Sequence, residues 1–167
     1  MLTAYHGFVR YNGAGDGSGL IRMDGGRCVL MVAMEEESCY RKYYDRLPTA
    51  EVLTADVEDL VNAWVEDGIL TGYVWKGQLV WLSVENQLNY RCAVDAAELG
   101  GLTFPYRVRV VGGDGVGYVE LSDAAELRTF WLGVQAHIRK LQEHGWVLKD
   151  GVIGEDLLNT MVDIDNE

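Results

Sequence analysis

The sequence has few cysteines, and no motif organises them. Cys28, Cys39 and Cys92 are the three cysteines, an odd number, and no two of them stand in a CxxC spacing. Small secreted domains are usually held together by an even set of disulfides, and zinc sites by closely spaced cysteine pairs. The sequence therefore indicates neither a disulfide framework nor a zinc site, and it favours reduced thiols.

Long apolar runs are also missing. A membrane-spanning helix needs about 20 consecutive, mostly apolar residues, and no stretch of the chain approaches that length. The opening Met1-Leu2-Thr3-Ala4-Tyr5-His6 lacks the basic segment and apolar run of a secretory leader. We therefore expect no membrane contact and an intracellular or virion setting.

Basic residues are scarce beside acidic ones. Lys and Arg number 14 against 26 Asp and Glu, which gives a formal net charge of -12. Such a charge repels phosphate backbones, so direct nucleic-acid binding is disfavoured. It leaves open plain solubility, which we favour, a basic protein partner, or mimicry of DNA.

The composition is that of a folded globular chain. Hydrophobic residues make up 49% of the 167 residues and charged residues 24%, enough apolar surface to build one core. We expect a β-meander lobe over residues 1–47, a helix-and-hairpin α+β core over residues 48–154 and an acidic tail over residues 155–167. Together these parts form one compact domain.

Three turns predict β-hairpins. Asp24-Gly25-Gly26, Lys76-Gly77 and Gly112-Gly113-Asp114-Gly115 each stand between segments rich in β-branched and aromatic residues. The period-two alternation over residues 5–11 and 28–34 adds strands to the first lobe. Because the connections are short, we predict antiparallel pairing and not a parallel, doubly wound sheet.

Helical spacing predicts about three amphipathic helices. The first helix ends at Gly68 and carries the apolar stripe Val57, Leu60, Val61, Trp64 and Val65. The second helix runs from Val84 to Leu99 and follows the N-cap Ser83. The third helix begins at a capping box of Asp123 and Glu126 and ends at Gly145, after which we expect Trp146 to fold back onto the core. The second has apolar residues on two faces, one of them Val84, Leu88, Cys92 and Leu99, which predicts a helix between two layers. The fold class is thus α+β: antiparallel β-hairpins or a meander packed with these helices.

No catalytic set, cofactor site or metal site is indicated. Gly13 to Gly19 resembles a phosphate-binding loop only superficially, because a strand follows it and no Gly-Lys-Ser/Thr is present. Asp16 and Asp114 supply too few oxygens for calcium. His137 and His144 match no metal-binding spacing and are expected to be structural.

Asp95 is the one carboxylate whose position is informative. The helical wheel places it on the stripe of Val84, Leu88 and Leu99, where an unpaired charge would be costly. We expect an ion pair with Arg107, Arg109 or Arg91; a catalytic acid is the alternative.

Aromatic residues are more abundant than one core of this size requires. The chain has five tryptophans and nine tyrosines, residue types that anchor protein interfaces. Most belong to the core, but exposed rings on the hairpins are candidates for contacting a partner.

Three segments together resemble a known group of proteins. They are Trp81-Leu82-Ser83-Val84-Glu85-Asn86-Gln87-Leu88-Asn89-Tyr90, Leu102-Thr103-Phe104-Pro105-Tyr106-Arg107-Val108, and residues 137–150, which end in Gly145-Trp146-Val147-Leu148-Lys149-Asp150. This composite over residues 78–152 resembles small gut-bacteriophage proteins, and more loosely the domain of unknown function near the ends of phage tail and tail-fibre proteins. The resemblance implies no catalytic residues. It implies a virion or host-cytoplasm setting and a tail or fibre protein as partner.

The sequence thus predicts a noncatalytic phage protein that acts by protein–protein interaction, either a minor tail or baseplate component or a tail-fibre assembly helper. The candidate partner-binding residues are Tyr73, Trp75, Trp81, Glu85, Asn86, Asn89 and Trp146. An alternative is an acidic, DNA-mimicking inhibitor of a host DNA-binding or defence protein, based on Asp56, Glu58, Asp59, Glu66 and Asp67. A hydrolase would require His137 or Asp95 in a deep pocket with a partner.

Overall fold

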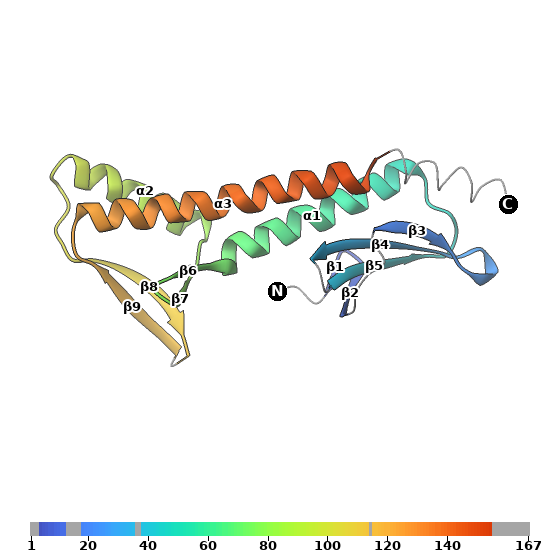
Figure 1. Cartoon of the computed structure of the whole chain (residues 1–167), viewed down its shortest axis with the longest axis horizontal. Coiled ribbons are helices and arrows are strands. Elements are labelled where there is room, and N and C mark those ends of the chain that lie inside the picture. Colours follow the sequence, from blue (N-terminus) through green and yellow to red (C-terminus); the bar gives the residue numbers. More distant parts are fainter. Residues whose placement is uncertain (1–3, 13–17, 36–37, 114, 155–167) are drawn as a thin grey trace. The chain divides into compact units, whose positions relative to one another are not determined.

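The computed structural model describes residues 4–12, 18–35, 38–113 and 115–154. Over these residues it has three α-helices and two antiparallel sheets, which confirms the predicted α+β class (Figure 1). The chain divides into two compact units, Met1–Val65 with Glu143–Glu167, and Glu66–Gln142. Each unit has a sheet and a core of its own. The predicted acidic tail, residues 155–167, lies outside the described residues.

The first unit contains a sheet of five strands. They are β1 (Ala4–Tyr5), β2 (Phe8–Asn12), β3 (Gly19–Arg22), β4 (Cys28–Glu35) and β5 (Ser38–Tyr44), in the order β1-β2-β5-β4-β3. The strand order departs from a strict meander because β5 lies between β2 and β4. The strand expected over residues 5–11 is broken at His6 and Gly7, where φ is positive at 43° and 83°. The predicted hairpin at Asp24–Gly26 joins β3 to β4.

The core of this unit lies between the sheet and the amino-terminal part of α1 (Ala50–Gly72). Alternate residues of β4 are buried, as the period-two pattern predicts. The buried core residues come from four strands, from α1 and from Val152 near the end of the chain's last helix: Phe8, Leu20, Cys28, Leu30, Val32, Met34, Tyr40, Leu53, Val57, Leu60, Val61 and Val152. The central strand of the sheet is β5, which includes the aromatic and basic segment Tyr40–Tyr44.

The second unit contains a sheet of four strands. They are β6 (Tyr73–Trp75), β7 (Gln78–Val80), β8 (Tyr106–Gly112) and β9 (Gly115–Leu121), in the order β6-β7-β8-β9. The two predicted hairpins are confirmed. Lys76 and Gly77 both have positive φ, 49° and 77°, as a two-residue hairpin turn of the I′ kind requires. Gly112 pairs with Gly115 at the other turn.

Two helices cover one face of this sheet, α2 (Val84–Glu98) and the amino-terminal part of α3 (Ala124–Val152) (Figure 1). The core combines inward-facing strand residues with one side of each helix. Its buried members are Tyr73, Val80, Leu82, Tyr90, Ala93, Val94, Val108, Val110, Leu121, Leu127, Phe130 and Val134. These two helices therefore leave the other face of the sheet uncovered.

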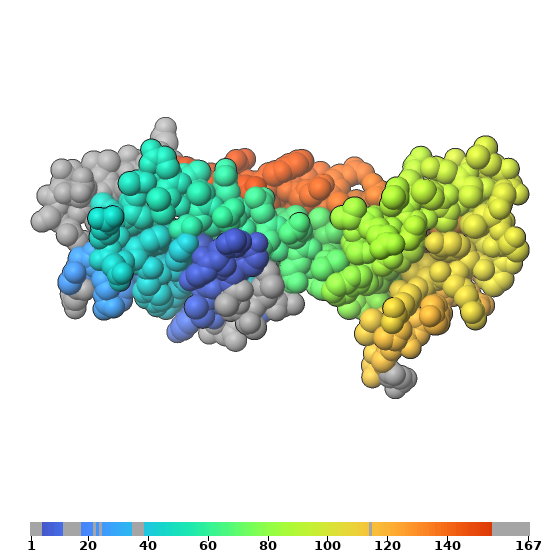
Figure 2. All heavy atoms as spheres, turned by 180° about the vertical axis from the view of Figure 1, so that it is seen from behind, coloured from blue at the N-terminus to red at the C-terminus, as the bar shows by residue number. Residues whose placement is uncertain are grey.

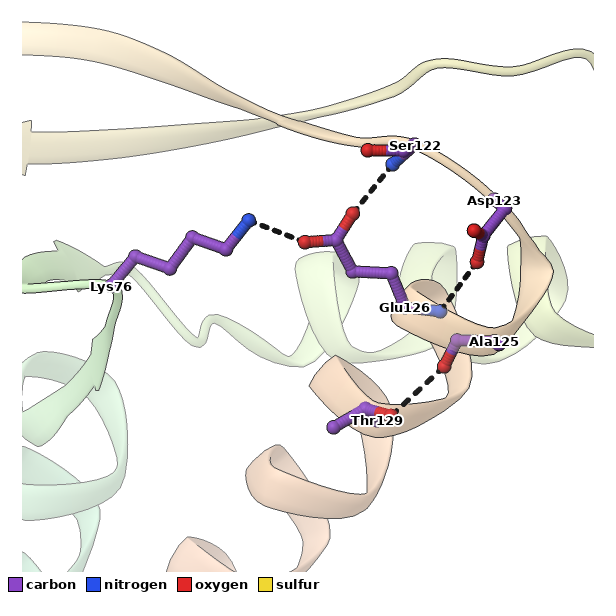
Figure 3. A network of polar contacts seen from close by, with 6 residues as sticks. All are labelled: Lys76, Ser122, Asp123, Ala125, Glu126 and Thr129. Carbon is purple, nitrogen blue, oxygen red and sulfur yellow. Dashed lines mark hydrogen bonds and ion pairs between the residues drawn. The ribbon is translucent and has the colours of Figure 1, made fainter.

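Polar contacts at the start of α3 confirm that Asp123 and Glu126 cap the helix, but Glu126 accepts from the residue before Asp123 and not from Asp123 itself (Figure 3). The backbone N–H of Glu126 donates to Asp123 Oδ1 at 2.9 Å, and the backbone N–H of Ser122 donates to Glu126 Oε2 at 2.7 Å. The same carboxylate forms an ion pair with Lys76 in the β6–β7 turn. One side chain thus caps a helix and ties a hairpin to it.

Two helices extend past the glycines that were expected to end them. α1 continues through Gly68 to Gly72, and α3 continues through Gly145 to Val152. Within their own units these glycines are points of close approach. A Cβ on Gly68 would lie 3.2 Å from Leu141 Cδ1, and one on Gly145 would lie 2.6 Å from Val65 Cγ2. Because α3 continues, Trp146 does not fold back and its side chain is 61% exposed.

The prediction that α2 packs between two layers is wrong. Its buried residues are Tyr90, Ala93 and Val94, which face the sheet and α3. The other predicted stripe is at the surface: Val84, Leu88 and Leu99 are 83%, 61% and 88% exposed, and Cys92 is exposed. The helix start is as predicted, with the Ser83 hydroxyl accepting from the backbone N–H of Asn86 at 3.2 Å.

Candidate protein-binding face

The sheet of the second unit exposes a row of apolar side chains on the side away from its helices. Val74 pairs with Leu79, Leu79 with Val111, and Val111 with Val116, so the four residues form one line across all four strands. Val74, Val111 and Val116 are 55%, 42% and 58% exposed. The solvent-facing side of an antiparallel sheet normally carries polar residues. We call these four residues the outer row.

A hollow lies beside the outer row. It has a volume of about 290 Å³ and is lined by Trp81, Asn86, Arg109, Val111 and Val116. The ring of Trp81 is 46% exposed, so a large apolar surface remains available to a partner. We call this the Trp81 hollow. Together with the outer row it forms what we call the outer face.

Hydrogen bonds fix the segment that carries Trp81. This residue lies between β7 and α2, and its carbonyl oxygen accepts from Asn86 Nδ2 at 2.8 Å. The next carbonyl, that of Leu82, accepts from Gln87 Nε2 at 2.8 Å, and the backbone N–H of Leu82 donates to Leu70 O at 3.1 Å. The wall of the hollow is therefore held in place by hydrogen bonds to its backbone, two from side chains of α2 and one to Leu70, as expected for a preorganised binding surface.

Two arginines of β8 stand on the outer face, and their surroundings differ. Arg107 Nε contacts Glu120 Oε1 at 3.2 Å, and its guanidinium lies 5.7 Å from the centre of the Tyr118 ring. Within the part of the chain that the structure describes, no acidic group pairs with Arg109. The Trp81 hollow thus combines apolar walls with one cation whose charge is not balanced locally.

The end of the β8–β9 hairpin stands clear of α2 (Figure 2). Val116 lies close to that end, and Tyr118, two residues further along β9, is 63% exposed. The register places Tyr118 directly opposite Arg109. These residues extend the outer face along the hairpin, where a partner can reach them.

The sheet of the first unit also exposes apolar side chains, but one of its arginines, Arg41, already contacts an aromatic ring beside them. Val9, Tyr11 and Tyr43 are 57%, 48% and 58% exposed. The guanidinium of Arg41 lies 3.9 Å from the centre of the Tyr11 ring, which is a cation–π contact. We therefore take the outer face of the second unit as the stronger candidate.

Two of the seven predicted site residues, Trp81 and Asn86, meet in the hollow. The predictions for Tyr73 and Trp75 need correction, because both side chains belong to the inward face of the sheet. Tyr73 is 7% exposed and its hydroxyl donates to Phe130 O at 3.2 Å, while the Trp75 ring packs edge-on against Phe130 with centroids 5.4 Å apart.

The other predicted residues lie outside the hollow. Glu85 and Asn89 are exposed on α2, and Trp146 belongs to the first unit. Sequence reasoning missed Arg109, Val111 and Val116. The signal was the alternation in β8, where Arg109 and Val111 occupy the phase opposite to Val108 and Val110.

The histidines and Asp95 have ordinary structural surroundings. His137 Nε2 lies 3.0 Å from Gly68 O, and His144 Nε2 lies 3.4 Å from Met34 O. Asp95 forms the predicted ion pair with one of its three candidates, Arg91, at 2.9 Å, but the pair is at the surface. No group of three or more potential metal ligands is found among the described residues. Asp16 and Asp114 are not among those residues.

Asp56 is the acidic residue with the most developed environment. Its carboxylate contacts Lys42 Nζ and accepts from the Tyr44 hydroxyl, each at 2.6 Å, and its side chain is 16% exposed. Burial, followed by the hydrogen bond to Asp56, raises the pKa of Tyr44. Because Lys42 neutralises this carboxylate, Asp56 does not contribute a free charge to the proposed DNA-like acidic surface.

No protein-family model, curated protein or solved structure matches the chain. Across residues 4–12, 18–35, 38–113 and 115–154, none of the helices is both long and apolar enough to cross a membrane.

Proposed function

We propose that this is a noncatalytic protein that binds another protein through the outer face. The observation that carries the proposal is the row of Val74, Leu79, Val111 and Val116 across four strands, continued by the exposed ring of Trp81. Contiguous exposed apolar residues mark interaction surfaces, and tryptophan and tyrosine are the residue types that most often dominate binding energy there.

The biological setting that we propose is a bacteriophage tail. The protein is a minor tail or baseplate component or a tail-fibre assembly helper, located in the virion or the host cytoplasm, and its partner is a tail or fibre protein. Support comes from the resemblance of residues 78–152 to phage proteins, since that region includes Trp81 and Asn86 from the Trp81 hollow. A tail assembles through contacts between proteins, and an exposed apolar sheet face can form such a contact.

Affinity capture with matched variants tests the proposal. The wild-type protein, Trp81→Ala and Val116→Thr are immobilised and exposed to lysate from phage-infected cells. The control is Leu132→Ala, which truncates an apolar residue of α3 that is 61% exposed and lies outside the outer face. Bound proteins are identified by mass spectrometry.

We expect the wild type and Leu132→Ala to retain the same phage protein. Trp81→Ala should lose most of it, because truncating a central aromatic anchor typically costs about 2 kcal/mol or more of binding free energy. Val116→Thr keeps the β-branched shape and strand propensity of valine but replaces one methyl group of the apolar row with a hydroxyl group, so it should also retain less of the partner. Equal retention by all four proteins would contradict the proposal.

A further inference from the structure

We propose that the Trp81 hollow receives an acidic, extended segment of the partner, with an Asp or Glu carboxylate placed against Arg109 and an apolar neighbour placed against Trp81. This inference rests on the proposed function and specifies the chemistry of the partner at one point of the outer face. The first support is charge: the guanidinium of Arg109 has no ion-pair partner in the described parts of the chain, whereas Arg107, two residues away, has Glu120.

The apolar walls of the hollow make the need for a carboxylate stronger. A partner that covers Trp81, Val111 and Val116 also removes water from Arg109, which lines the same hollow. Removing water from a guanidinium without supplying another acceptor costs much free energy. A carboxylate avoids this cost because it can accept two parallel N–H hydrogen bonds from the guanidinium. A purely apolar or basic segment is therefore excluded as the occupant.

Asn86 indicates that the occupant is extended. Its side-chain N–H donates to the Trp81 carbonyl oxygen, and its amide oxygen accepts no hydrogen bond from the residues that the structure describes. The residue lines the hollow, so this oxygen is available to a backbone N–H of a bound segment. An extended chain presents backbone N–H groups beside alternating side chains, and so it can satisfy Asn86 and Arg109 together.

A second copy of this chain is a poorer occupant. A symmetric pair joined through the Trp81 hollow brings the Arg109 side chains of both copies toward one axis, and like charges in a closed interface repel. The net charge of -12 on each copy adds to that repulsion. A separate protein with a local acidic segment brings no second arginine into the interface and places a carboxylate beside Arg109.

Selection from a display library of random peptides tests the inference. The targets are the wild-type protein, Arg109→Gln and Arg109→Glu. Arg128→Gln is the charge-matched control, since it removes one positive charge from an exposed ion pair with Glu98 in the same unit. Each substitution changes an exposed side chain, so all four proteins should fold, which circular dichroism checks. Peptides that also bind Trp81→Ala are discarded, so that only those that need the hollow are counted.

We expect the wild type and Arg128→Gln to enrich peptides in which Asp or Glu adjoins an apolar residue. Arg109→Gln should lose the acidic preference, and Arg109→Glu should replace it with a preference for Lys or Arg. For a peptide selected on the wild type, changing its acidic residue to the matching amide should weaken binding by about ten-fold or more. The same change should have little effect on binding to Arg109→Gln.

The inference is overturned if the enriched peptides show no acidic preference, if the preference persists in Arg109→Gln, or if the wild type enriches no peptide that depends on Trp81. It is also overturned if light scattering shows a dimer that Arg109→Gln strengthens and Trp81→Ala dissolves, because a second copy then occupies the hollow. In the first three cases, a Trp81-dependent partner in the lysate capture would still support the proposed function, so the two failures can be told apart.

Discussion

The hydroxyl group of Tyr73 fills the space beside the α-carbon of Gly133 in α3, and it donates a hydrogen bond to the carbonyl oxygen of Phe130 at 3.2 Å. The first strand of the second sheet is thereby joined to α3 inside the core. Burial raises the pKa of Tyr73 to about 12, so the phenol stays protonated and keeps its hydrogen bond even at pH values of about 10, where an exposed tyrosine loses its proton. Glycine at position 133 is what allows this contact.

Replacing Gly133 with alanine should therefore destabilise the protein. Alanine favours a helix over glycine by about 1 kcal/mol, but the added methyl group would overlap the Tyr73 hydroxyl, and overpacking of this kind costs about 1 to 3 kcal/mol. Urea unfolding should therefore show a lower free energy of unfolding for Gly133→Ala than for the wild type. A second substitution, Tyr73→Phe, removes the hydroxyl group and should recover part of the lost stability, since the nearest remaining ring atom lies 3.4 Å from the position of the added methyl group.

Gly151→Ala is the matched control for this prediction. A Cβ at position 151, near the end of the same helix, would meet nothing within 4 Å, so the substitution should leave stability unchanged or raise it by up to about 1 kcal/mol. If Gly133→Ala were as stable as Gly151→Ala, the close packing of Tyr73 against α3 would be wrong.

The carboxylate of Glu126 should make stability depend on pH. The hydrogen bond from Lys76, followed by the hydrogen bonds from Ser122, lowers the pKa of Glu126 to about 2. Because the folded state favours the ionised form, this contribution is present above the unfolded pKa of about 4.3 and is lost as pH falls through that value toward 2. Thermal unfolding of Glu126→Gln should show a lower midpoint than wild type at pH 7, and the difference should disappear near pH 2.

Glu143→Gln provides the comparison for Glu126, because Glu143 is an exposed glutamate on the same helix. It removes the same charge from an exposed position, so its midpoint difference from the wild type measures the effect of net charge at each pH. A difference for Glu126→Gln that stays constant over this range would mean that the pair with Lys76 does not hold the carboxylate in its ionised form.

Asp56 and Asp95 should differ in what their removal costs. Asp56 is mostly buried with Lys42, at 16% and 22% side-chain exposure, so Asp56→Ala leaves a largely buried cation without its partner and should cost about 2 to 4 kcal/mol. Asp95 pairs with Arg91 at the helix surface, where such pairs contribute about 0.5 kcal/mol or less. Urea unfolding of the two variants gives the loss in the free energy of unfolding for each. Equal losses at Asp56 and Asp95 would contradict the prediction.

Substitutions in the outer face should separate binding from stability. Surface changes usually alter the free energy of unfolding by about 0.5 kcal/mol, and we expect Val111→Thr and Val116→Thr to stay near that value because threonine keeps the β-branched shape. Calorimetry of each variant checks this, with Val110→Thr as the buried comparison on the same strand; its exposure is 1%. Val110→Thr should be clearly less stable, since a hydroxyl replaces a methyl group in the core.

The sequence predicted the features that depend on local chemistry. The turns at Asp24–Gly26 and Lys76-Gly77 and the helix starts at Ser83 and Asp123 were found because a few neighbouring residues determine them. The antiparallel α+β class followed from the short connections between strands. The residue pattern alone was sufficient for these elements.

Features that depend on residues distant in sequence were missed. Gly68 and Gly145 have the residue type that commonly ends a helix, but their role depends on Leu141 and Val65, which only the fold brings close. In α2 the stripe of Val84, Leu88 and Leu99 has core-like spacing, yet in the described part of the chain only one side of the helix has a packing partner. Periodicity shows which residues share a face, but not whether that face is covered.

Only part of the candidate site was predicted, for the same reason. Trp81 and Asn86 were identified within one continuous segment, whereas Arg109 and Val116 join them only through the pairing of β7, β8 and β9. Tyr73 and Trp75 were misplaced because the inward and outward phases of a three-residue strand cannot be told apart when both are apolar.

Site-specific photo-crosslinking in infected cells tests the central claim most directly, the claim that the outer face contacts a protein partner. A photoreactive residue replaces Val116 in one protein and Leu132 in another; both positions are exposed, and only the first lies on the outer face. We predict that illumination links position 116 to a phage tail or fibre protein and leaves position 132 unlinked. No crosslink from position 116, or the same product from both positions, would contradict the claim.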